Sequence, residues 1–218
     1  MKRLLFVALS FTLLFASCVK KPAEAPVGEA KVRFVNAAIG TESQDLYINA
    51  GLVVTSPLGY RGSSPYFGYL SGFNVFAFAN TGTQVATSSV DYASAIGSNS
   101  TIFQYRNLNG LIVSDPIPDD TSAPAAGKFK VRFVHLNHFL NNSMKVAVTG
   151  GSDLFAALNF RAASAYYEVD PGTKFTASAT GVTNAPEIVI NATAGKVYTI
   201  WFSGEDEKQL IPNLLIHN

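Results

Sequence analysis

The chain has 218 residues, a formal net charge of +1 at pH 7 and a single cysteine, Cys18. With one thiol, the sequence excludes an internal disulfide and any metal site built from several cysteines. The near-neutral charge and the lack of a basic stripe argue against a nucleic-acid partner, because phosphate binding needs clustered lysine and arginine.

The first 17 residues have the pattern of a secretory signal peptide. Residues 1–3 include two basic side chains, residues 4–14 are mostly apolar, and Ala16 and Ser17 precede Cys18. This arrangement resembles a bacterial lipoprotein signal, which implies cleavage before Cys18 and attachment of diacylglycerol to its thiol. The alternative is a transmembrane anchor, but the apolar run is shorter than the roughly 20 residues that span a bilayer.

The predicted address is therefore the cell envelope, with the membrane as a partner through lipidated Cys18. We expect the outer membrane of a Gram-negative bacterium, and the sequence leaves open which side the protein faces. Residues 18–29 are rich in proline, alanine and charge, which predicts a flexible tether. Residues 116–127 contain three prolines and are predicted to be a linker, since proline does not join a central strand.

An internal duplication dominates the rest of the chain. The segment Lys31–Val35, with the sequence KVRFV, returns unchanged as Lys130–Val134, and further matches continue at separations of 98 to 100 residues. A repeat of this length suits an independently folding domain rather than a solenoid unit. We predict one domain over residues 30–115 and a second over residues 128–218.

Each repeat has the periodicity of β-strands. Apolar and polar residues alternate over segments such as 31–35, 45–49, 73–80 and 197–203, and turn residues separate these segments every eight to twelve positions. Many short strands at this spacing predict an all-β protein with a two-sheet sandwich in each repeat.

Comparison of the repeats predicts which side chains face inward. Six pairs stay apolar in both copies and are predicted inward: Val32/Val131, Phe34/Phe133, Leu46/Val146, Ile48/Val148, Val75/Phe175 and Ala77/Ala177. Phe76 and Phe78 lie opposite Thr176 and Ser178 at a separation of 100, which predicts that both phenylalanines face outward. Such an apolar patch indicates contact with the neighbouring repeat, a covering loop or a ligand.

The two strand motifs at the start of the first repeat, Ala30–Ala37 and Asp45–Gly51, resemble the bacterial family known as domain of unknown function 4397. Tyr66 with Gly72, Tyr166 with Gly172, and the segment 198–200 fit later motifs of that family. The second copy departs from the pattern at 145–150, where the acidic residue and the tyrosine are missing. The resemblance implies immunoglobulin-like or transthyretin-like sandwiches, often in tandem on extracytoplasmic lipoproteins, and no established activity.

The sequence carries no motif for catalysis. It lacks a Gly-x-Ser-x-Gly elbow, a phosphate-binding loop and an HExxH helix. His135 and His138, three apart in a predicted strand, point to opposite faces and cannot share one metal ion. We therefore predict a protein that is not an enzyme and that uses no cofactor or metal.

Four arginines recur at equivalent positions, as Arg33/Arg132 and Arg61/Arg161. Retention in both copies predicts a structural role within each domain, such as bonding a carboxylate or a loop carbonyl.

The favoured function is binding or adhesion of a glycan or protein partner. Five aromatic residues of the first repeat are candidates for a stacking platform: Tyr66, Tyr69, Phe76, Phe78 and Tyr105. For each of these residues, packing in a core or between the domains is the competing interpretation. The alternative function is a structural spacer or assembly subunit that offers sheet edges for strand addition.

Overall fold

The computed structural model describes residues 26–53, 56–183 and 187–218. The described residues form strands and turns only, and they contain no helix able to cross a membrane. Cys18 and the predicted signal peptide lie outside them. The strands are β1 (Glu29–Asn36), β2 (Gln44–Ile48), β3 (Gly51–Leu52), β4 (Phe67–Leu70), β5 (Gly72–Asn80), β6 (Ala86–Ser94), β7 (Asn99–Arg106), β8 (Ile112–Asp119), β9 (Phe129–His135), β10 (Met144–Val148), β11 (Asp153–Leu158), β12 (Tyr167–Val169), β13 (Phe175–Ala179), β14 (Glu187–Ile188), β15 (Val197–Ser203) and β16 (Ile211–Ile216).

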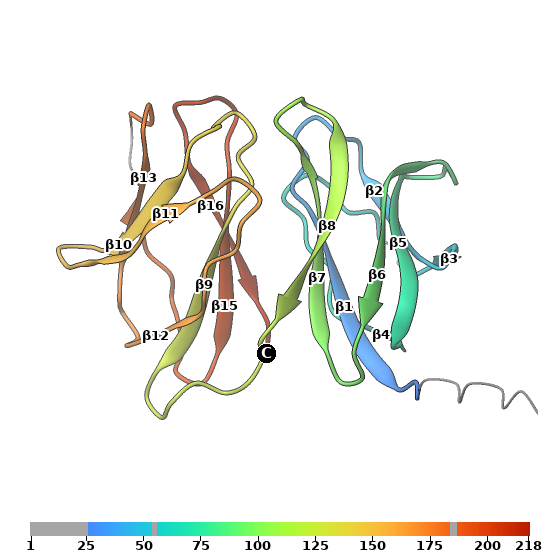
Figure 1. The fold of residues 1–218 in the computed structure, drawn as a ribbon, viewed down its shortest axis with the longest axis horizontal. Coiled ribbons are helices and arrows are strands. Elements are labelled where there is room, and N and C mark those ends of the chain that lie inside the picture. The colour runs from blue at the N-terminus through green and yellow to red at the C-terminus, as the bar shows by residue number, and fades with distance from the viewer. Residues whose placement is uncertain (1–25, 54–55, 184–186) are drawn as a thin grey trace, which may run out of the picture.

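The strands form two β-sandwiches with the same topology (Figure 1). In the first sandwich the sheets have the orders β4-β1-β7-β8 and β3-β2-β5-β6, and in the second β12-β9-β15-β16 and β11-β10-β13-β14. The only parallel pairs among the described strands are the equivalent ones, β1 with β7 and β9 with β15. The predicted all-β fold with a sandwich in each repeat is confirmed.

The sheets β4-β1-β7-β8 and β12-β9-β15-β16 face each other across the middle of the molecule, and we call them the inner sheets (Figure 1). In the second inner sheet the central strands β9 and β15 are buried on both faces, since every one of their residues is buried. One face of each inner sheet covers the core of its own sandwich. The other face contributes to a third apolar cluster, the junction, which consists of Val35, Ala37, Phe103, Tyr105, Val134, Leu136, Trp201 and Leu215.

Burial of both faces explains why the segment KVRFV is retained. Val32 and Phe34 point into the first core, whereas Val35 points into the junction, and the second copy repeats this pattern. The separation of 98 residues between β7 and β15 is also confirmed. Val35 lies beside Phe103 in β7, and Val134 lies beside Trp201 in β15.

The predicted faces of β5 are wrong. Phe76 and Phe78 are fully buried in the first core, and Val75, predicted inward, is exposed. Leu46 pairs with Phe78 and Val146 pairs with Ala177, so the equivalent residues of β5 and β13 are 99 apart rather than 100.

The cause is a one-residue difference in the turn before the strand. Four steps lead from Gly72 to Phe76 and only three lead from Gly172 to Phe175. Because side chains alternate along a strand, this single offset moves every residue to the opposite face.

The predicted linker begins too early. Residues 116–119 form the end of β8, an outermost strand of its sheet. Pro116 and Pro118 are tolerated there because an edge strand leaves alternate backbone nitrogens without a partner in the sheet.

The position of Phe76 generates a stability prediction. Phe76→Ala should lower the free energy of unfolding by about 3–5 kcal/mol, the usual cost of removing a buried phenylalanine. Phe73, in the same strand, is 70% exposed, so Phe73→Ala should change stability by no more than about 0.5 kcal/mol. Urea denaturation of both variants measures the difference. Equal effects would contradict the observed register of β5.

Candidate functional site

The five predicted platform residues do not form an exposed surface. Phe76, Phe78 and Tyr105 are fully buried, and the ring of Tyr69 packs edge-on against Phe76 with centroids 5.2 Å apart. Tyr105 belongs to the junction, and Tyr66 reaches the second sandwich. These residues therefore pack in the core and between the domains, as the competing interpretation proposed.

Polar side chains from both sandwiches meet beside the junction in a closed ring of hydrogen bonds. We call Tyr66, Asp119, Arg132, Thr199 and His217 the junction ring. The first two come from the first sandwich and the other three from the second. The side chains of Asp119 and His217 are inaccessible to solvent, and that of Arg132 nearly so.

The ring fixes the position of each proton. Tyr66 Oη donates to Asp119 Oδ2 (2.6 Å), so it accepts from His217 Nδ1 (2.6 Å). His217 Nε2 lies 2.7 Å from Thr199 Oγ1, and because burial disfavours a second proton on the ring, Nε2 accepts from that hydroxyl, whose oxygen accepts from Arg132 Nε (2.9 Å). Arg132 Nη2 closes the ring by donating to Asp119 Oδ1. His217 is therefore neutral, with its proton on Nδ1.

The pKa values agree with this assignment. Burial lowers the pKa of His217 to about 4, although the nearby Asp119 carboxylate acts in the opposite direction. Burial and the charge of Asp119 raise the pKa of the Tyr66 hydroxyl far above its usual value. The ring thus contains one ion pair, between Asp119 and Arg132, and holds the other three side chains uncharged.

The duplication places Asp119 and His217 at equivalent positions. Ile117 of β8 lies beside Thr101, and Leu215 of β16 lies beside the equivalent Thr199. Asp119 and His217 each follow two residues later, so they correspond. The two copies therefore place different side chains, a carboxylate and an imidazole, at the same position of the junction. A single carboxylate faces two equivalent arginines, Arg33 and Arg132.

Asp119 bonds the arginine of the opposite sandwich. Arg33 instead places its guanidinium 4.4 Å from the ring centroid of Tyr66. Such a cation–π contact supplies part of the stabilisation that an anion would give.

The repeated arginines were predicted to bond within their own domains, but three of the four have their carboxylate partner in the other domain. Arg132 bonds Asp119, Arg161 Nη2 bonds Asp115 Oδ2 at 2.7 Å, and Arg61 lies 3.8 Å from Glu205, each across the junction. Sequence comparison reveals that a side chain is retained but not which domain supplies its partner.

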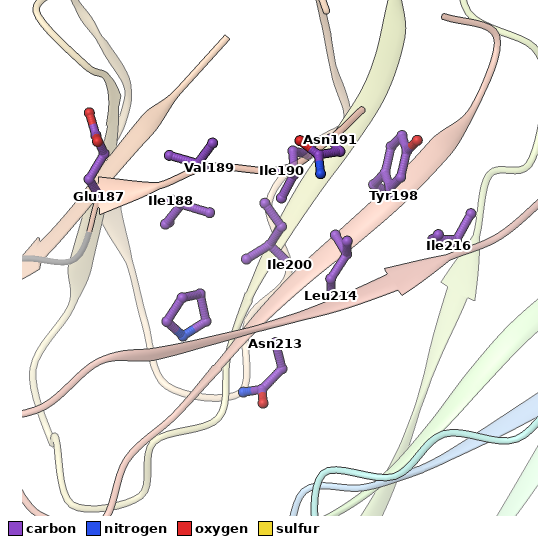
Figure 2. A pocket seen from close by; sticks show the side chains of 11 residues that line it. Glu187, Ile188, Val189, Ile190, Asn191, Tyr198, Ile200, Asn213, Leu214 and Ile216 are labelled. Carbon is purple, nitrogen blue, oxygen red and sulfur yellow. The ribbon is translucent and has the colours of Figure 1, made fainter. Parts of the chain in front are cut away.

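The second sandwich has an apolar cleft of about 500 Å³ between β15–β16 and the segment 187–191 (Figure 2). Its floor is made of core side chains, among them Ile188 and Ile200, which are buried. Leu214 and Ile216 lie on the core-facing side of β16, beside Ile200 and Tyr198, yet they are 44% and 51% exposed. The cleft is a part of the core that the described residues leave uncovered.

The first sandwich closes the equivalent place. There β6 runs for nine residues beside β8, and Ser88 Oγ bonds Ser114 Oγ across the two sheets at 2.6 Å. Tyr92 Oη also bonds Ser100 Oγ at 3.1 Å. In the second sandwich β14 has only two residues, and Ile190 stands where the first copy has Tyr92.

The edge strands β8 and β16 of the two inner sheets also differ. Pro116 and Pro118 of β8 correspond to Leu214 and Ile216 of β16. The amide of His217 bonds the carbonyl of Val197, so the amides of Leu214 and Ile216, one residue out of phase, point away from the sheet. The prolines remove these donors from the first sandwich, whereas the second sandwich keeps them.

Within the described ranges, no three histidine, cysteine, aspartate or glutamate side chains are placed to hold a metal ion. His135 is buried in β9 and burial lowers its pKa to about 4, whereas His138 lies in the following loop.

The fold and the junction define a tandem β-sandwich protein. Residues 30–142, from the first strand to beyond β9, match the family model described as Domain of unknown function (DUF4397). This match covers more than half of the 218 residues, and the chain belongs to that family.

Other comparisons add little. No curated protein matches the sequence. A solved structure with some similarity is the Bacillus anthracis TIE protein, with 9% sequence identity, a TM-score of 0.27, and an alignment that covers 83% of this chain and 35% of that chain. The chain thus spans about a third of that protein, and the likeness carries no functional argument.

The ion pair of the junction ring generates a second prediction. Asp119→Ala leaves Arg132 buried without its carboxylate, and it should lower the free energy of unfolding by about 3–5 kcal/mol. The matched control is Asp153→Ala, which removes the exposed pair with Lys145 (3.5 Å) and should cost no more than about 1 kcal/mol. Chemical denaturation measures both. A small effect at Asp119 would show that the ring does not hold the sandwiches together.

The buried histidines generate a pH prediction. His135 and His217 titrate near 4 in the folded protein and near 6.5 when unfolded. Between these values only the unfolded chain binds the protons, so stability falls as pH falls from about 6.5 to about 4. Each histidine should contribute a slope of at most about 1.4 kcal/mol per pH unit.

His217→Gln removes one titrating group, and the slope of unfolding free energy against pH should become shallower. Urea denaturation at several pH values in this window provides the measurement. An unchanged slope would mean that His217 is not buried as a neutral side chain.

Proposed function

We propose that this protein is a non-enzymatic, lipid-anchored protein of the cell envelope that binds an extended segment of a partner protein at β16. Lipidation of Cys18 supplies the anchor, and the outer membrane of a Gram-negative bacterium is the proposed location. The observation that carries the binding proposal is the exposure of Leu214 and Ile216, two large aliphatic side chains on the core-facing side of an edge strand.

The edge offers both parts of a strand-binding site. The outward amides at 214 and 216 supply main-chain donors, and the cleft supplies apolar contacts for alternate side chains of an added strand. An uncovered edge of this kind also invites aggregation, which proteins normally prevent with proline or charge. The first sandwich follows that rule at Pro116 and Pro118, whereas the second has proline only at Pro212 and keeps the amides of Leu214 and Ile216.

The lining of the cleft favours a protein segment over a glycan. Sugar sites combine polar groups with an accessible aromatic face. The cleft is lined by six isoleucine, valine and leucine side chains together with Pro212, Glu187, Asn191 and Asn213, and the one aromatic side chain among its described lining residues, Tyr198, is buried. Its hydroxyl already accepts a hydrogen bond from the amide of Thr193 at 3.0 Å.

The junction favours a second function, that of an assembly subunit with a fixed shape. The buried ion pair and the apolar junction join the sandwiches into one unit, so a partner on the second sandwich is held at a defined place relative to the first. This function is compatible with strand addition at β16, and it needs no small ligand.

Site-specific photo-crosslinking in cells that produce the intact lipoprotein tests the proposal. A photoreactive residue at position 214 should crosslink to one envelope protein, in a segment whose apolar residues alternate. The additional change Ile216→Lys should strongly reduce that crosslink, because it places a charge in the cleft. The matched control is position 52, since Leu52 is a comparably exposed leucine on the first sandwich.

Three results would contradict the proposal. One is equal crosslinking from positions 52 and 214 to the same proteins. Another is a crosslink at 214 that does not respond to Ile216→Lys. The third is a crosslinked product at 214 that contains only glycan or lipid.

A further inference from the structure

Four exposed apolar side chains gather at one end of the first sandwich: Val27, Leu70, Phe73 and Ile96. We call this end the apolar tip. Leu70, Phe73 and Ile96 are 67%, 70% and 55% exposed. Singly exposed apolar residues are ordinary, but a group of them in one place usually marks a contact with another surface.

Hydrogen bonds between neighbouring residues bring the segments that carry these four side chains to the same end of the sandwich. The amide of Gly28 bonds Ser71 Oγ at 3.0 Å, and the amide of Ser71 bonds the carbonyl of Gly28 at 2.7 Å. These bonds place Val27 beside the turn that carries Leu70 and Phe73. The amide of Gly97 bonds the carbonyl of Glu29, and this bond brings Ile96 to the same end.

The second sandwich lacks this group, although its fold is the same. Asp170 occupies the position of Leu70, Ala194 that of Ile96, and Thr173 follows Gly172 where Phe73 follows Gly72. The β-sandwich itself therefore does not require apolar side chains here. Only the copy that begins next to the predicted anchor carries them.

We infer that the apolar tip lies against the bilayer surface and inserts these side chains among the lipid headgroups. The inference rests on the proposed lipid anchor at Cys18. Eight residues lie between Cys18 and Val27, and an extended chain over these nine steps reaches about 30 Å. The tip is therefore the end of the folded part that the tether holds nearest to the membrane. Apolar side chains at such a surface enter the boundary between headgroups and acyl chains.

Contact at the tip also sets the orientation of the second sandwich. Equivalent ends of the two sandwiches lie on the same side of the molecule, because β4 and β12 are both near the lower edge of Figure 1. The inner-sheet strands would then run away from the membrane surface, and β16 would extend away from the bilayer with them.

Fluorescence quenching by lipid tests this inference on the full lipidated protein in vesicles of phosphatidylethanolamine and phosphatidylglycerol with brominated acyl chains. Trp201 is the single tryptophan, and Trp201→Phe removes its signal with the residue type that Phe103 provides at the equivalent position. The tip probe is Phe73→Trp in that background. The distal probe is Val85→Trp, at an exposed position in the β5–β6 hairpin, at the opposite end of β5.

The expected result is that lipid quenches the tip probe at least about twofold more strongly than the distal probe, as shallow insertion requires. Flotation with the vesicles, compared with a Cys18→Ser variant, tests the anchor separately. Flotation of the lipidated protein with equal quenching of the two probes would overturn the tip and leave the anchor intact.

If Cys18 carries no lipid, the Cys18→Ser protein mixed with the same vesicles tests whether the apolar tip binds the membrane without an anchor. Selective quenching of the tip probe would then support a tip that binds membrane by itself, although the proposed anchor had failed. No quenching of either probe would overturn both.

Discussion

The arrangement of this molecule depends on the burial of both faces of its two inner sheets. A strand with one wet face alternates apolar and polar residues, but β1 and β9 cannot, since one face packs on a core and the other on the junction. Arg33 and Arg132 are polar residues on the junction side, as is Lys130, and each arginine lies against a tyrosine ring. The segment KVRFV is thus retained because both faces of the strand that contains it pack against other parts of the protein.

The junction ring solves an electrostatic problem that the duplication creates. Two identical copies packed face to face would bring two equivalent arginines together, and burial of both without an anion would be costly. With Asp119 in one copy and His217 in the other, the ring holds one anion, which Arg132 binds directly. A second carboxylate at position 217 would face Asp119 across the Tyr66 hydroxyl and repel it. The asymmetry therefore suits a pair of fused copies better than a symmetric dimer.

The sequence was sufficient for the duplication, which identities between the copies reveal, for the fold class, which strand periodicity predicts, and for the core-facing residues of β1 and β9, which stay apolar in both copies. It was insufficient for β5, where a one-residue difference before the strand reverses the faces of Phe76 and Phe78 without changing the composition. It was also insufficient for the junction ring, whose members touch only after two folded domains dock. The retained pairs Tyr66/Tyr166 and Arg33/Arg132 were the available signal, but they show no preference for a partner within the domain or outside it.

The two copies have diverged in the parts that duplication leaves free. The central strands of the inner sheets remain alike because the junction constrains them, whereas the copies differ at their edge strands and tips. The first copy has proline at 116 and 118, a long β6 and apolar residues at its tip. The second copy has a short β14, a strand β16 with free amides at 214 and 216, and small or polar residues at the equivalent tip. The apolar tip is therefore present only on the first copy, and the open edge at β16 only on the second. This complementary pattern is what a division of tasks produces: the first sandwich is suited to the membrane, the second to a partner, and the junction keeps the two surfaces in a fixed relation.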